Sequence, residues 1–383
     1  MKRICYVTTV PGTLSSFVIP IAKRLMQMTD WEITVICNTD AAFAERLPEG
    51  IRYIPIPMKR GISLGGIGAM LKMYQVFRKE KFDLVQYSTP NASLYASLAA
   101  WLARVPVRLY CQWGIAYVGF HGFKRTVFKC IEKLVCTLST WIEPDSFGNL
   151  NFSHAEGLYP ERKGSVIWNG SASGVDLQKF DISHKDRWRT QIRSLFEIPD
   201  DAAVIGFVGR ITGDKGVNEM FTAFRAVLKK YPDTYLMLVG NMEKADSVDA
   251  ALYEWAQQEP HVLFCGYTNV VEQYLSAMDI YLLPSYREGF GSVVIEAEAM
   301  GLPVIVSDIP GPTNAMVRNK TGLVVPVKDA TALAEAMETL LNSPELRCSF
   351  GETGYEFASN GFEQQKLAEK ILVDRKKLLE HTT

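Results

Sequence analysis

The stretch IYLLPSYREGFGSVVIE, residues 280–296, contains the pattern that decides the fold. It begins with the short apolar run Ile280–Pro284, passes through a turn with glycine at 289 and 291, and continues as a helical pattern from near Ser292. A buried strand followed by a helix is the repeating unit of parallel sheets that are covered on both faces. The two glycines let the turn approach a ligand without interference from a Cβ atom.

The same alternation of short apolar runs and helical patterns extends along the whole chain. In the first half the candidate strands are Ile4–Thr9, Glu32–Cys37, Arg52–Ile56, Leu84–Ser88, Val107–Cys111 and Ser165–Trp168. In the second half they are Val204–Val208, Tyr235–Val239, Val262–Cys265, Ile280–Pro284, Val304–Ser307 and Leu323–Val327. Two such series predict an α/β protein with two doubly wound, Rossmann-like domains.

The length of 383 residues suits two domains of 100–200 residues each. The polar segment 171–201 has a weak strand signal, so it is the predicted linker between an N-terminal domain (1–170) and a C-terminal domain (202–361). Residues 362–383 predict a final helix, which packs on the second domain or crosses back to the first.

Composition excludes several classes of protein. A hydrophobic fraction of 48% and a charged fraction of 22% exclude wholesale disorder. No apolar run is long enough for a transmembrane helix, and we interpret the N-terminus as mature sequence rather than a signal peptide. The seven cysteines contain no Cys-x-x-Cys pair, which excludes common zinc and thioredoxin motifs and favours a reducing, cytoplasmic setting.

The charges are divided unevenly along the chain. Residues 1–160 carry 18 Lys and Arg against 11 Asp and Glu, whereas the remainder carries 23 against 31. The segment Phe120–Trp141 interleaves basic and apolar side chains, a pattern typical of a helix that lies in an anionic membrane surface. Packing of the apolar side chains into the core, with solvated lysines, is the alternative.

A second glycine-rich turn, Gly209–Gly216, directly follows the candidate strand Val204–Val208. Ligands of parallel sheets bind beyond the carboxyl ends of strands, and Arg210 and Lys215 suit two linked phosphates there. Alone, such a turn is more commonly an ordinary surface loop. Together with the helix start near Ser292, which favours anions, it predicts a two-sided clamp for a diphosphate.

The carboxylates Glu288 and Glu296 flank this predicted anion site, where they are placed to accept hydrogen bonds from sugar hydroxyls. An ordinary helix start with two solvated glutamates is the alternative. No Asp-x-Asp and no His-Glu-x-x-His occurs, so the sequence predicts no metal site and no other cofactor. A third turn, Val10–Ser15, follows the first strand, and its Gly12 either approaches a ligand or simply connects strand and helix.

These motifs resemble those of retaining glycosyltransferases of family four, which have the GT-B fold of two Rossmann-like domains facing across a cleft. The resemblance rests on Glu288-x7-Glu296, Gly209-Arg210…Lys215-Gly216, Trp168-Asn169-Gly170…Gly174-Val175-Asp176…Phe180, Pro284–Phe290 and Gly301-x-Pro303-Val304-Ile305-x-Ser307-Asp308. It is dense over 165–330 and looser over 1–160. The chain is most similar to bacterial enzymes that extend undecaprenyl-diphosphate-linked saccharides for capsule, O-antigen or glycoprotein glycans.

The resemblance implies a role for each matching residue. Arg210, Lys215 and Glu288 would be catalytic, with Arg210 and Lys215 on the donor diphosphate and Glu288 near the 3- and 4-hydroxyls of the transferred sugar. Glu296 would bond the ribose hydroxyls. The backbone of Gly289, Phe290, Gly291 and Ser292 would receive sugar and phosphate oxygens, the base would lie near Gly240, Cys265 and Tyr267, and Gly12 would lie under the diphosphate.

The chain departs from the family where a His often precedes a Gly after the fifth N-terminal strand. That position is Trp113 here, and His121 is nearby but not at the matching place. We assign both to the acceptor side and name no catalytic His. The departure fits a mechanism in which the departing diphosphate acts as the base.

The resemblance implies a metal-independent hexosyl- or N-acetylhexosaminyltransferase that acts on a nucleotide sugar, with UDP the commonest carrier. Its partners would be a lipid-diphosphate-linked saccharide and the inner face of the plasma membrane, with no nucleic acid. A sugar-nucleotide 2-epimerase of the same fold is the alternative enzyme, and a nucleotide-sugar-binding scaffold is the non-enzymatic one. A nicotinamide oxidoreductase is disfavoured because neither leading strand is followed by Gly-x-Gly-x-x-Gly.

Overall fold

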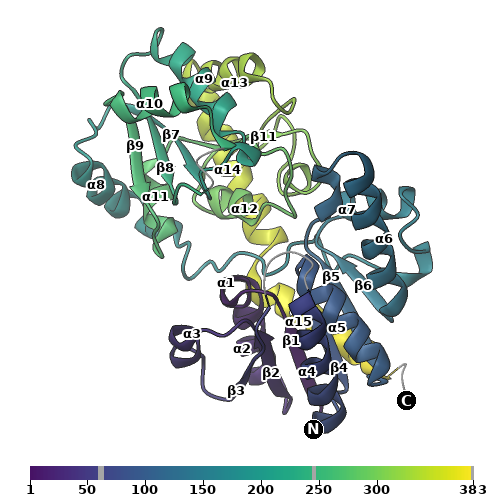
Figure 1. Ribbon diagram of the computed structural model, residues 1–383. Coiled ribbons are helices and arrows are strands. Elements are labelled where there is room, and N and C mark those ends of the chain that lie inside the picture. Colours follow the sequence, from purple (N-terminus) through teal and green to yellow (C-terminus); the bar gives the residue numbers. More distant parts are fainter. Residues whose placement is uncertain (59–63, 244–246, 381–383) are drawn as a thin grey trace. The chain divides into compact units, whose positions relative to one another are not determined.

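Two six-stranded parallel sheets organise the computed structural model, which describes residues 1–58, 64–243 and 247–380 (Figure 1). They belong to two compact units. The first comprises Met1–Ser173 and Gln364–Thr383, and the second comprises Gly174–Glu363. The predicted fold class is confirmed.

The first sheet has the strand order β3-β2-β1-β4-β5-β6. Its strands are β1 (Arg3–Val7), β2 (Glu32–Cys37), β3 (Ile51–Pro55), β4 (Leu84–Tyr87), β5 (Val107–Gln112) and β6 (Trp141–Pro144). The helices are α1 (Pro11–Thr13), the π-helix η1 (Leu14–Val18), α2 (Ile19–Met28), α3 (Ala41–Glu45), α4 (Leu64–Glu80), α5 (Pro90–Leu102), α6 (Gly122–Leu138) and α7 (Phe147–Ala155), with α15 (Gln364–Glu380) from the end of the chain. Short 3-10 turns are η2 (Ala116–Gly119) and η3 (Glu161–Lys163).

The predicted strand Ser165–Trp168 is wrong, because the sixth strand is β6, earlier in the chain. At 164–165 the chain touches β6 through a single bridge, Gly164 to Ile142, and a hydrogen bond from the Ser165 N–H to the Ile142 carbonyl of 3.2 Å. Trp168 then has a φ of 51°, in the left-handed region. A strand does not continue through that conformation.

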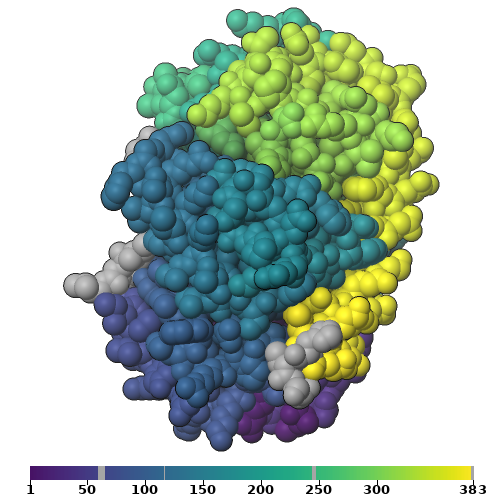
Figure 2. Space-filling model, turned by 90° about the vertical axis from the view of Figure 1, so that its right-hand side faces the viewer, coloured from purple at the N-terminus to yellow at the C-terminus, as the bar shows by residue number. Residues whose placement is uncertain are grey.

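The final helix α15 packs into the first unit. Leu367, Ala368 and Ile371 are buried in the same cluster as the strand residues Ile4 and Ile33. In Figure 2 this yellow segment lies beside the purple and blue residues of the first unit at the lower right. Its buried Arg375 bonds Glu143 at the end of β6 and, at 3.1 Å, the Gln86 side chain of β4.

The second sheet has the strand order β12-β11-β10-β7-β8-β9. Its strands are β7 (Ala203–Val208), β8 (Thr234–Val239), β9 (Val262–Gly266), β10 (Ile280–Leu283), β11 (Val304–Ser307) and β12 (Gly322–Val325). The helices are α8 (Lys185–Leu195), α9 (Val217–Leu228), α10 (Ala250–Gln258), α11 (Val271–Ala277), α12 (Ser292–Ala299), α13 (Ala330–Leu341) and α14 (Pro344–Gly361). Short 3-10 turns are η4 (Ile182–His184), η5 (Gly213–Lys215) and η7 (Pro312–Asn314).

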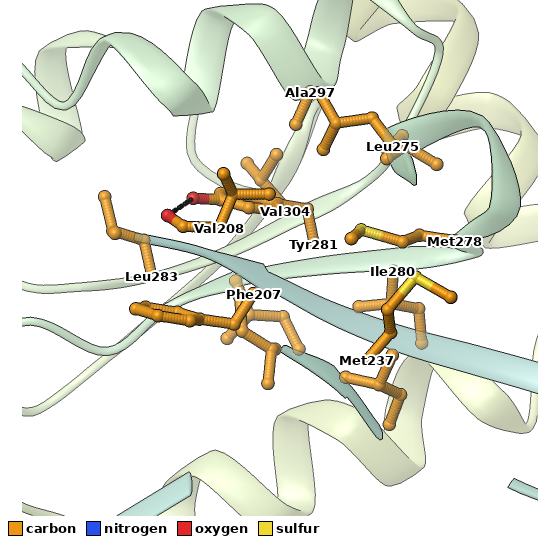
Figure 3. Close-up of a cluster of buried hydrophobic side chains, with 14 of the residues drawn as sticks. Phe207, Val208, Met237, Leu275, Met278, Ile280, Tyr281, Leu283, Ala297 and Val304 are labelled. Atoms are coloured by element: carbon orange, nitrogen blue, oxygen red, sulfur yellow. Dashed lines mark hydrogen bonds between the residues drawn. The ribbon is translucent and has the colours of Figure 1, made fainter. Parts of the chain in front are cut away.

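The core of this unit lies around β7 and β10 at the centre of the sheet. Phe207, Tyr281 and Met278 are fully buried there, and the Tyr281 hydroxyl approaches the Val208 carbonyl at 3.5 Å (Figure 3). Gly206 is in close contact with Met278, because a Cβ atom at 206 would lie 2.0 Å from the Met278 sulfur. Central strands packed on both faces hold the loops at their carboxyl ends in place.

The segment predicted as a linker, 171–201, is mostly part of the second unit. It contains η4 and α8, and α8 buries Trp188, Ile192 and Arg193. Arg193 is buried because its guanidinium bonds the Asp279 carboxylate at 2.8 Å and several backbone carbonyls. This strongly polar helix thus packs on the second unit through two apolar side chains, Trp188 and Ile192, and through the paired Arg193.

Candidate active site

The candidate site lies at the carboxyl ends of β7 and β10. The chain runs from β7 to β8 and β9 on one side and then returns to form β10 on the other side of β7. In open sheets of this kind, the crevice in which ligands bind lies outside the carboxyl ends of the strands, at the point where the strand order reverses. Gly209–Gly216 follows β7, and Pro284–Ser292 follows β10.

Glycines hold these loops together backbone to backbone. A Cβ atom on Gly216 would lie 2.0 Å from the Pro284 carbonyl oxygen, and one on Gly240 would lie 1.9 Å from that of Gly209. Gly216 has a φ of 73°, and Gly240 has a φ of 142°. Any side chain at either position would therefore push the loops of neighbouring strands apart.

Lys215 and Glu288 meet between the two loops. The Lys215 ammonium bonds Glu288 Oε1, and the Ser285 hydroxyl donates a hydrogen bond of 2.7 Å to the same oxygen. The side chains of Lys215 and Glu288 are only 16% and 14% exposed. The structure thus brings together two of the three predicted catalytic residues in a partly dehydrated setting, where charge interactions are strong.

Arg210 lies on the same loop but reaches outward. Its guanidinium is 3.3 Å from the Glu243 carboxylate, and both side chains are nearly half exposed. Arg210 and Lys215 both act on Asp214: burial alone would raise the pKa of this carboxyl, but the hydrogen bond from Thr212 and the charges of Arg287, Arg210 and Lys215 lower it. The two predicted cations therefore share the neighbour Asp214, while Arg210 forms its ion pair with Glu243 and Lys215 with Glu288.

Two residues of this neighbourhood, Asp214 and Arg287, were not among the predicted site residues. The Arg287 guanidinium is 3.4 Å from the Asp214 carboxylate, which also accepts a hydrogen bond of 2.6 Å from the Thr212 hydroxyl. Both lie within the motifs noted above, next to Glu288 and Lys215. Their pairing is set by how the two loops approach each other, which residue spacing does not reveal.

The helix α12 begins at Ser292, as predicted. Its N-cap is Gly291, with a φ of 82° and no side chain to cap the first N–H groups. Phe290 is buried with its ring 5.3 Å from that of Phe362, so its side chain packs in the core of the second unit. Gly289 is held against Gly311, where a Cβ atom would lie 1.6 Å from the Gly289 carbonyl oxygen.

Glu296 lies one turn into α12, beside an ion pair that sequence reasoning missed. Lys179 and Glu272 are 3.7 Å apart, and Glu272 is buried. Burial raises the pKa of Glu296 to about 7; the positive charge of Lys179 opposes the shift and the negative charge of Glu272 adds to it. This shift brings the titration of Glu296 into the neutral pH range.

The remaining donor-side predictions lie near the ends of β8 and β9. The Gly240 N–H donates to the Gly266 carbonyl at 2.8 Å, and Cys265 is partly buried, which raises the pKa of its thiol to about 12. Tyr267 is 70% exposed, with its hydroxyl 2.8 Å from the Asn269 side chain. Because β8 lies between β7 and β9 in the sheet, these three positions lie on the β8 and β9 side of the loop that carries Arg210 and Lys215.

The predicted residues of the first unit lie at the carboxyl ends of β1 and β5. Gly12 is in α1, exposed, with no atom within 4 Å of a Cβ placed there, so the fold itself does not require glycine. Trp113 is half-buried, with its ring 5.6 Å from that of Phe17. His121 is exposed at the start of α6 and makes no side-chain cap.

Within the described part of the chain, no group of three His, Cys, Asp or Glu side chains is arranged to hold a metal ion. None of the described helices is both long enough and apolar enough to span a bilayer.

The geometry and the comparisons with known proteins define the same class of protein. Residues 189–357 match the model of the family "Glycosyl transferases group 1", and residues 3–142 match "Glycosyl transferase 4-like". The capsular polysaccharide biosynthesis glycosyltransferase CapM of Staphylococcus aureus is 32% identical over 88% of this chain and 87% of its own length. This chain belongs to the family-four glycosyltransferases, which have the GT-B fold.

Two further proteins are similar over nearly the full length. The UDP-Gal:alpha-D-GlcNAc-diphosphoundecaprenol alpha-1,3-galactosyltransferase of Escherichia coli is 26% identical over 91% of this chain and 89% of its own. The crystal structure of Anabaena Alr3699/HepE in complex with UDP and glucose has a TM-score of 0.81 at 19% identity, covering 98% of this chain and 100% of the other. The second likeness shows the fold alone.

Proposed function

We propose that this glycosyltransferase moves a hexosyl or N-acetylhexosaminyl group from a UDP-sugar to a lipid-diphosphate-linked saccharide in the assembly of a bacterial surface polysaccharide such as capsule. The observation that carries the proposal is the Lys215–Glu288–Ser285 cluster beside the start of α12 at the β7–β10 crevice. The similar capsule enzyme of S. aureus and the E. coli enzyme with its UDP-galactose donor support it.

In this proposal Lys215, Arg210 and the first N–H groups of α12 bind the donor diphosphate. An ammonium, a guanidinium and a helix N-terminus offer charge and hydrogen bonds to two linked phosphates. Glu288 accepts hydrogen bonds from the sugar, Glu296 from the ribose, and the loops at Gly240, Cys265 and Tyr267 receive the base. From the first unit, Gly12 lies under the donor diphosphate, and Trp113 and His121 lie on the acceptor side.

The proposed chemistry breaks the bond between the anomeric carbon and the diphosphate oxygen. The acceptor hydroxyl oxygen attacks the anomeric carbon from the face of the departing group, so the anomeric configuration is retained, and its proton passes to the diphosphate oxygen. Negative charge grows on that oxygen as the bond breaks. Lys215 and the start of α12 stabilise this charge, and the protein supplies no metal and no separate base.

The pKa of Glu296 predicts a pH-dependent affinity for the donor. Raising the pH from 6 to 8 increases the ionised fraction of a carboxyl with a pKa near 7 from roughly 10% to roughly 90%. If the carboxylate accepts the ribose hydroxyls, KM for the donor falls severalfold over this range. The variant Glu296→Gln should show a flat profile. An unchanged slope in this variant would assign the pH dependence to another group.

The helix α6 carries the proposed membrane contact. Phe123 and Leu134 are 84% and 41% exposed, and with Val127 and Cys130 they follow the spacing of a single helix face. Val135 and Cys136 are buried on the opposite face. Exposed Lys124 and Lys133 lie on either side of the outer apolar stripe. Such a stripe with lysine flanks fits the interface of a bilayer with anionic lipids.

Vesicle binding tests this surface. The double variant Phe123→Ser/Leu134→Ser should bind phosphatidylglycerol-containing vesicles about tenfold or more weakly, because burying each apolar side chain stabilises by about 1.5–3 kcal/mol. Co-sedimentation measures the binding. The matched control is Leu195→Ser, which removes a 67% exposed leucine from the second unit. Equal binding of all three proteins, or none in the unmodified chain, would refute the membrane assignment.

Product analysis separates transfer from epimerisation. The purified chain is incubated with labelled UDP-sugars, one at a time, with and without an undecaprenyl-diphosphate-linked saccharide. Transfer predicts a labelled lipid-linked product and release of UDP only when both substrates are present, with no requirement for magnesium. A changed sugar configuration from the donor alone would instead establish the 2-epimerase.

A further inference from the structure

A cavity of about 430 Å³ lies in the second unit, away from the candidate active site. Its lining includes Asp279 and Pro303, which directly precede β10 and β11. Glu288 follows the carboxyl end of β10, and Lys215 follows that of the neighbouring parallel strand β7, where the chain leaves the sheet. The cavity is therefore at the amino edge of the sheet, opposite the crevice assigned to the donor.

The cavity is built between α8, the turn after α12, and one face of α14. The α14 residues that line it recur at helical spacing: Pro344, Arg347, Cys348, Gly351, Glu352 and Tyr355. Gly351 packs directly on the turn, because a Cβ atom there would lie 2.5 Å from the Gly301 carbonyl oxygen. The larger side chains before and after Gly351 then form the walls, which gives a hollow of the size that small ligands occupy.

Asp279, one of the two carboxylates in this lining, already has its hydrogen-bond partners within the protein. The Asp279 carboxylate accepts hydrogen bonds of 2.8 Å from Arg189, from the buried Arg193 and from the Val204 N–H. Two guanidinium groups thus share a single carboxylate. The other lining carboxylate, Glu352, is exposed and accepts a hydrogen bond of 3.3 Å from the Cys348 thiol.

Two lining cations have no carboxylate partner among the described residues. The Lys185 ammonium makes one hydrogen bond, of 3.3 Å, to the Gly301 carbonyl. The Arg347 guanidinium bonds the carbonyls of Leu340 and Leu341. Burial lowers the pKa of Lys185 to about 8, and the charge of Arg189 adds to this shift, whereas the charges of Asp279 and Asp186, which form no ion pair with Lys185, oppose it. An anion between Lys185 and Arg347 would correct this imbalance.

We propose that this cavity is a second ligand site, which binds a small phosphate monoester of about the size of a sugar phosphate. The volume accommodates such a molecule, and an ammonium with a guanidinium suits a single phosphate group. The exposed Glu352 and the apolar lining residues Ile182 and Leu302 would face the uncharged part of the ligand. This site is independent of the donor site.

Alkylation of Cys348 tests the proposal on the unmodified chain. Cys348 is exposed in the lining, and Cys130 is an exposed cysteine in the first unit that serves as the internal control. Glucose 6-phosphate at ten times its dissociation constant should slow iodoacetamide alkylation of Cys348 about tenfold and leave Cys130 unaffected. Glucose at the same concentration should protect neither. The absence of protection by glucose 6-phosphate, or equal protection by glucose, would overturn the proposal.

Two variants locate the protection within the second unit. Lys185→Met keeps the length of the side chain and removes its charge, and it should abolish the protection of Cys348. Lys215→Met removes the corresponding charge from the candidate active site, and it should leave the protection intact. Protection that survives in Lys185→Met and disappears in Lys215→Met would mean that the phosphate binds only at the donor site.

Discussion

Replacing Lys215 with alanine is expected to slow sugar transfer by about 10²–10³-fold, because one preorganised charge that stabilises a growing negative charge is worth about 2.7–4 kcal/mol. The lysine is 16% exposed and bonds Glu288, so it acts in a partly dehydrated site. The variant should remain folded, since Ser285 still donates a hydrogen bond to Glu288. Initial rates of transfer at saturating acceptor measure the effect.

Glu288→Ala should be similarly inactive, because it removes the acceptor for the sugar hydroxyls and the partner that positions Lys215. Lys230→Ala provides the matched control: this lysine is 62% exposed in the same unit and pairs with Glu338. Its loss should leave the rate unchanged. Near-normal turnover of either Lys215→Ala or Glu288→Ala would contradict the assignment of a catalytic role to this site.

Replacing Arg375 with alanine is expected to destabilise the first unit by about 3–5 kcal/mol, the usual cost of removing one partner from a buried ion pair. Arg375 is 2% exposed, and its guanidinium bonds both oxygens of Glu143 as well as Gln86. The substitution leaves the Glu143 carboxylate without its principal partner in the core. Urea-induced unfolding followed by circular dichroism measures the change.

The neighbouring Lys376, which is exposed, is the control, and Lys376→Ala should change the free energy of unfolding by less than about 0.5 kcal/mol. The double variant Arg375→Leu/Glu143→Leu should recover part of the lost stability, because it removes both charges of the buried pair and leaves only the partly exposed Asp374 carboxylate without its partner. A stability loss for Arg375→Ala as small as that of the control would show that α15 is held by its apolar side chains alone.

The strands of the second unit were predictable because they are short apolar runs, and β7, β8, β10 and β11 are buried along nearly their whole length. β11 was predicted with its observed bounds, and β7, β8, β9 and β10 within one residue at each end. The same rule failed at β6, whose sequence Trp141-Ile142-Glu143-Pro144 includes a charge and a proline. β6 lies at the edge of its sheet, and its Glu143 is stabilised by Arg375, which is more than 200 residues away in sequence.

The helix α8 was missed for a related reason. Its sequence is dominated by charged residues, and the apolar side chains that it buries are only Trp188 and Ile192. Arg193 is buried as well, which a sequence pattern marks as exposed. Its burial depends on Asp279, at the start of β10. The spacing of apolar residues along a sequence does not reveal charge pairs between residues that are far apart in the chain.

In the candidate site, residue identities were easier to predict than their pairings. The turn Gly289–Ser292 begins α12 as expected, and Lys215 lies against Glu288. The pairing of Arg210 with Glu243, and that of Asp214 with Arg287, depend on how separate loops meet. For Phe290 the motif did not reveal the position of the side chain, because its ring packs against Phe362 in the core.

Titration of UDP into the chain by calorimetry tests most directly whether Lys215 and the start of α12 bind the donor diphosphate. We predict that UDP binds the unmodified chain and Lys230→Ala with equal affinity, and that Lys215→Ala weakens binding at least about tenfold, which corresponds to 1.4 kcal/mol. Equal affinity of Lys215→Ala and the unmodified chain for UDP would contradict the assignment of this crevice to the diphosphate.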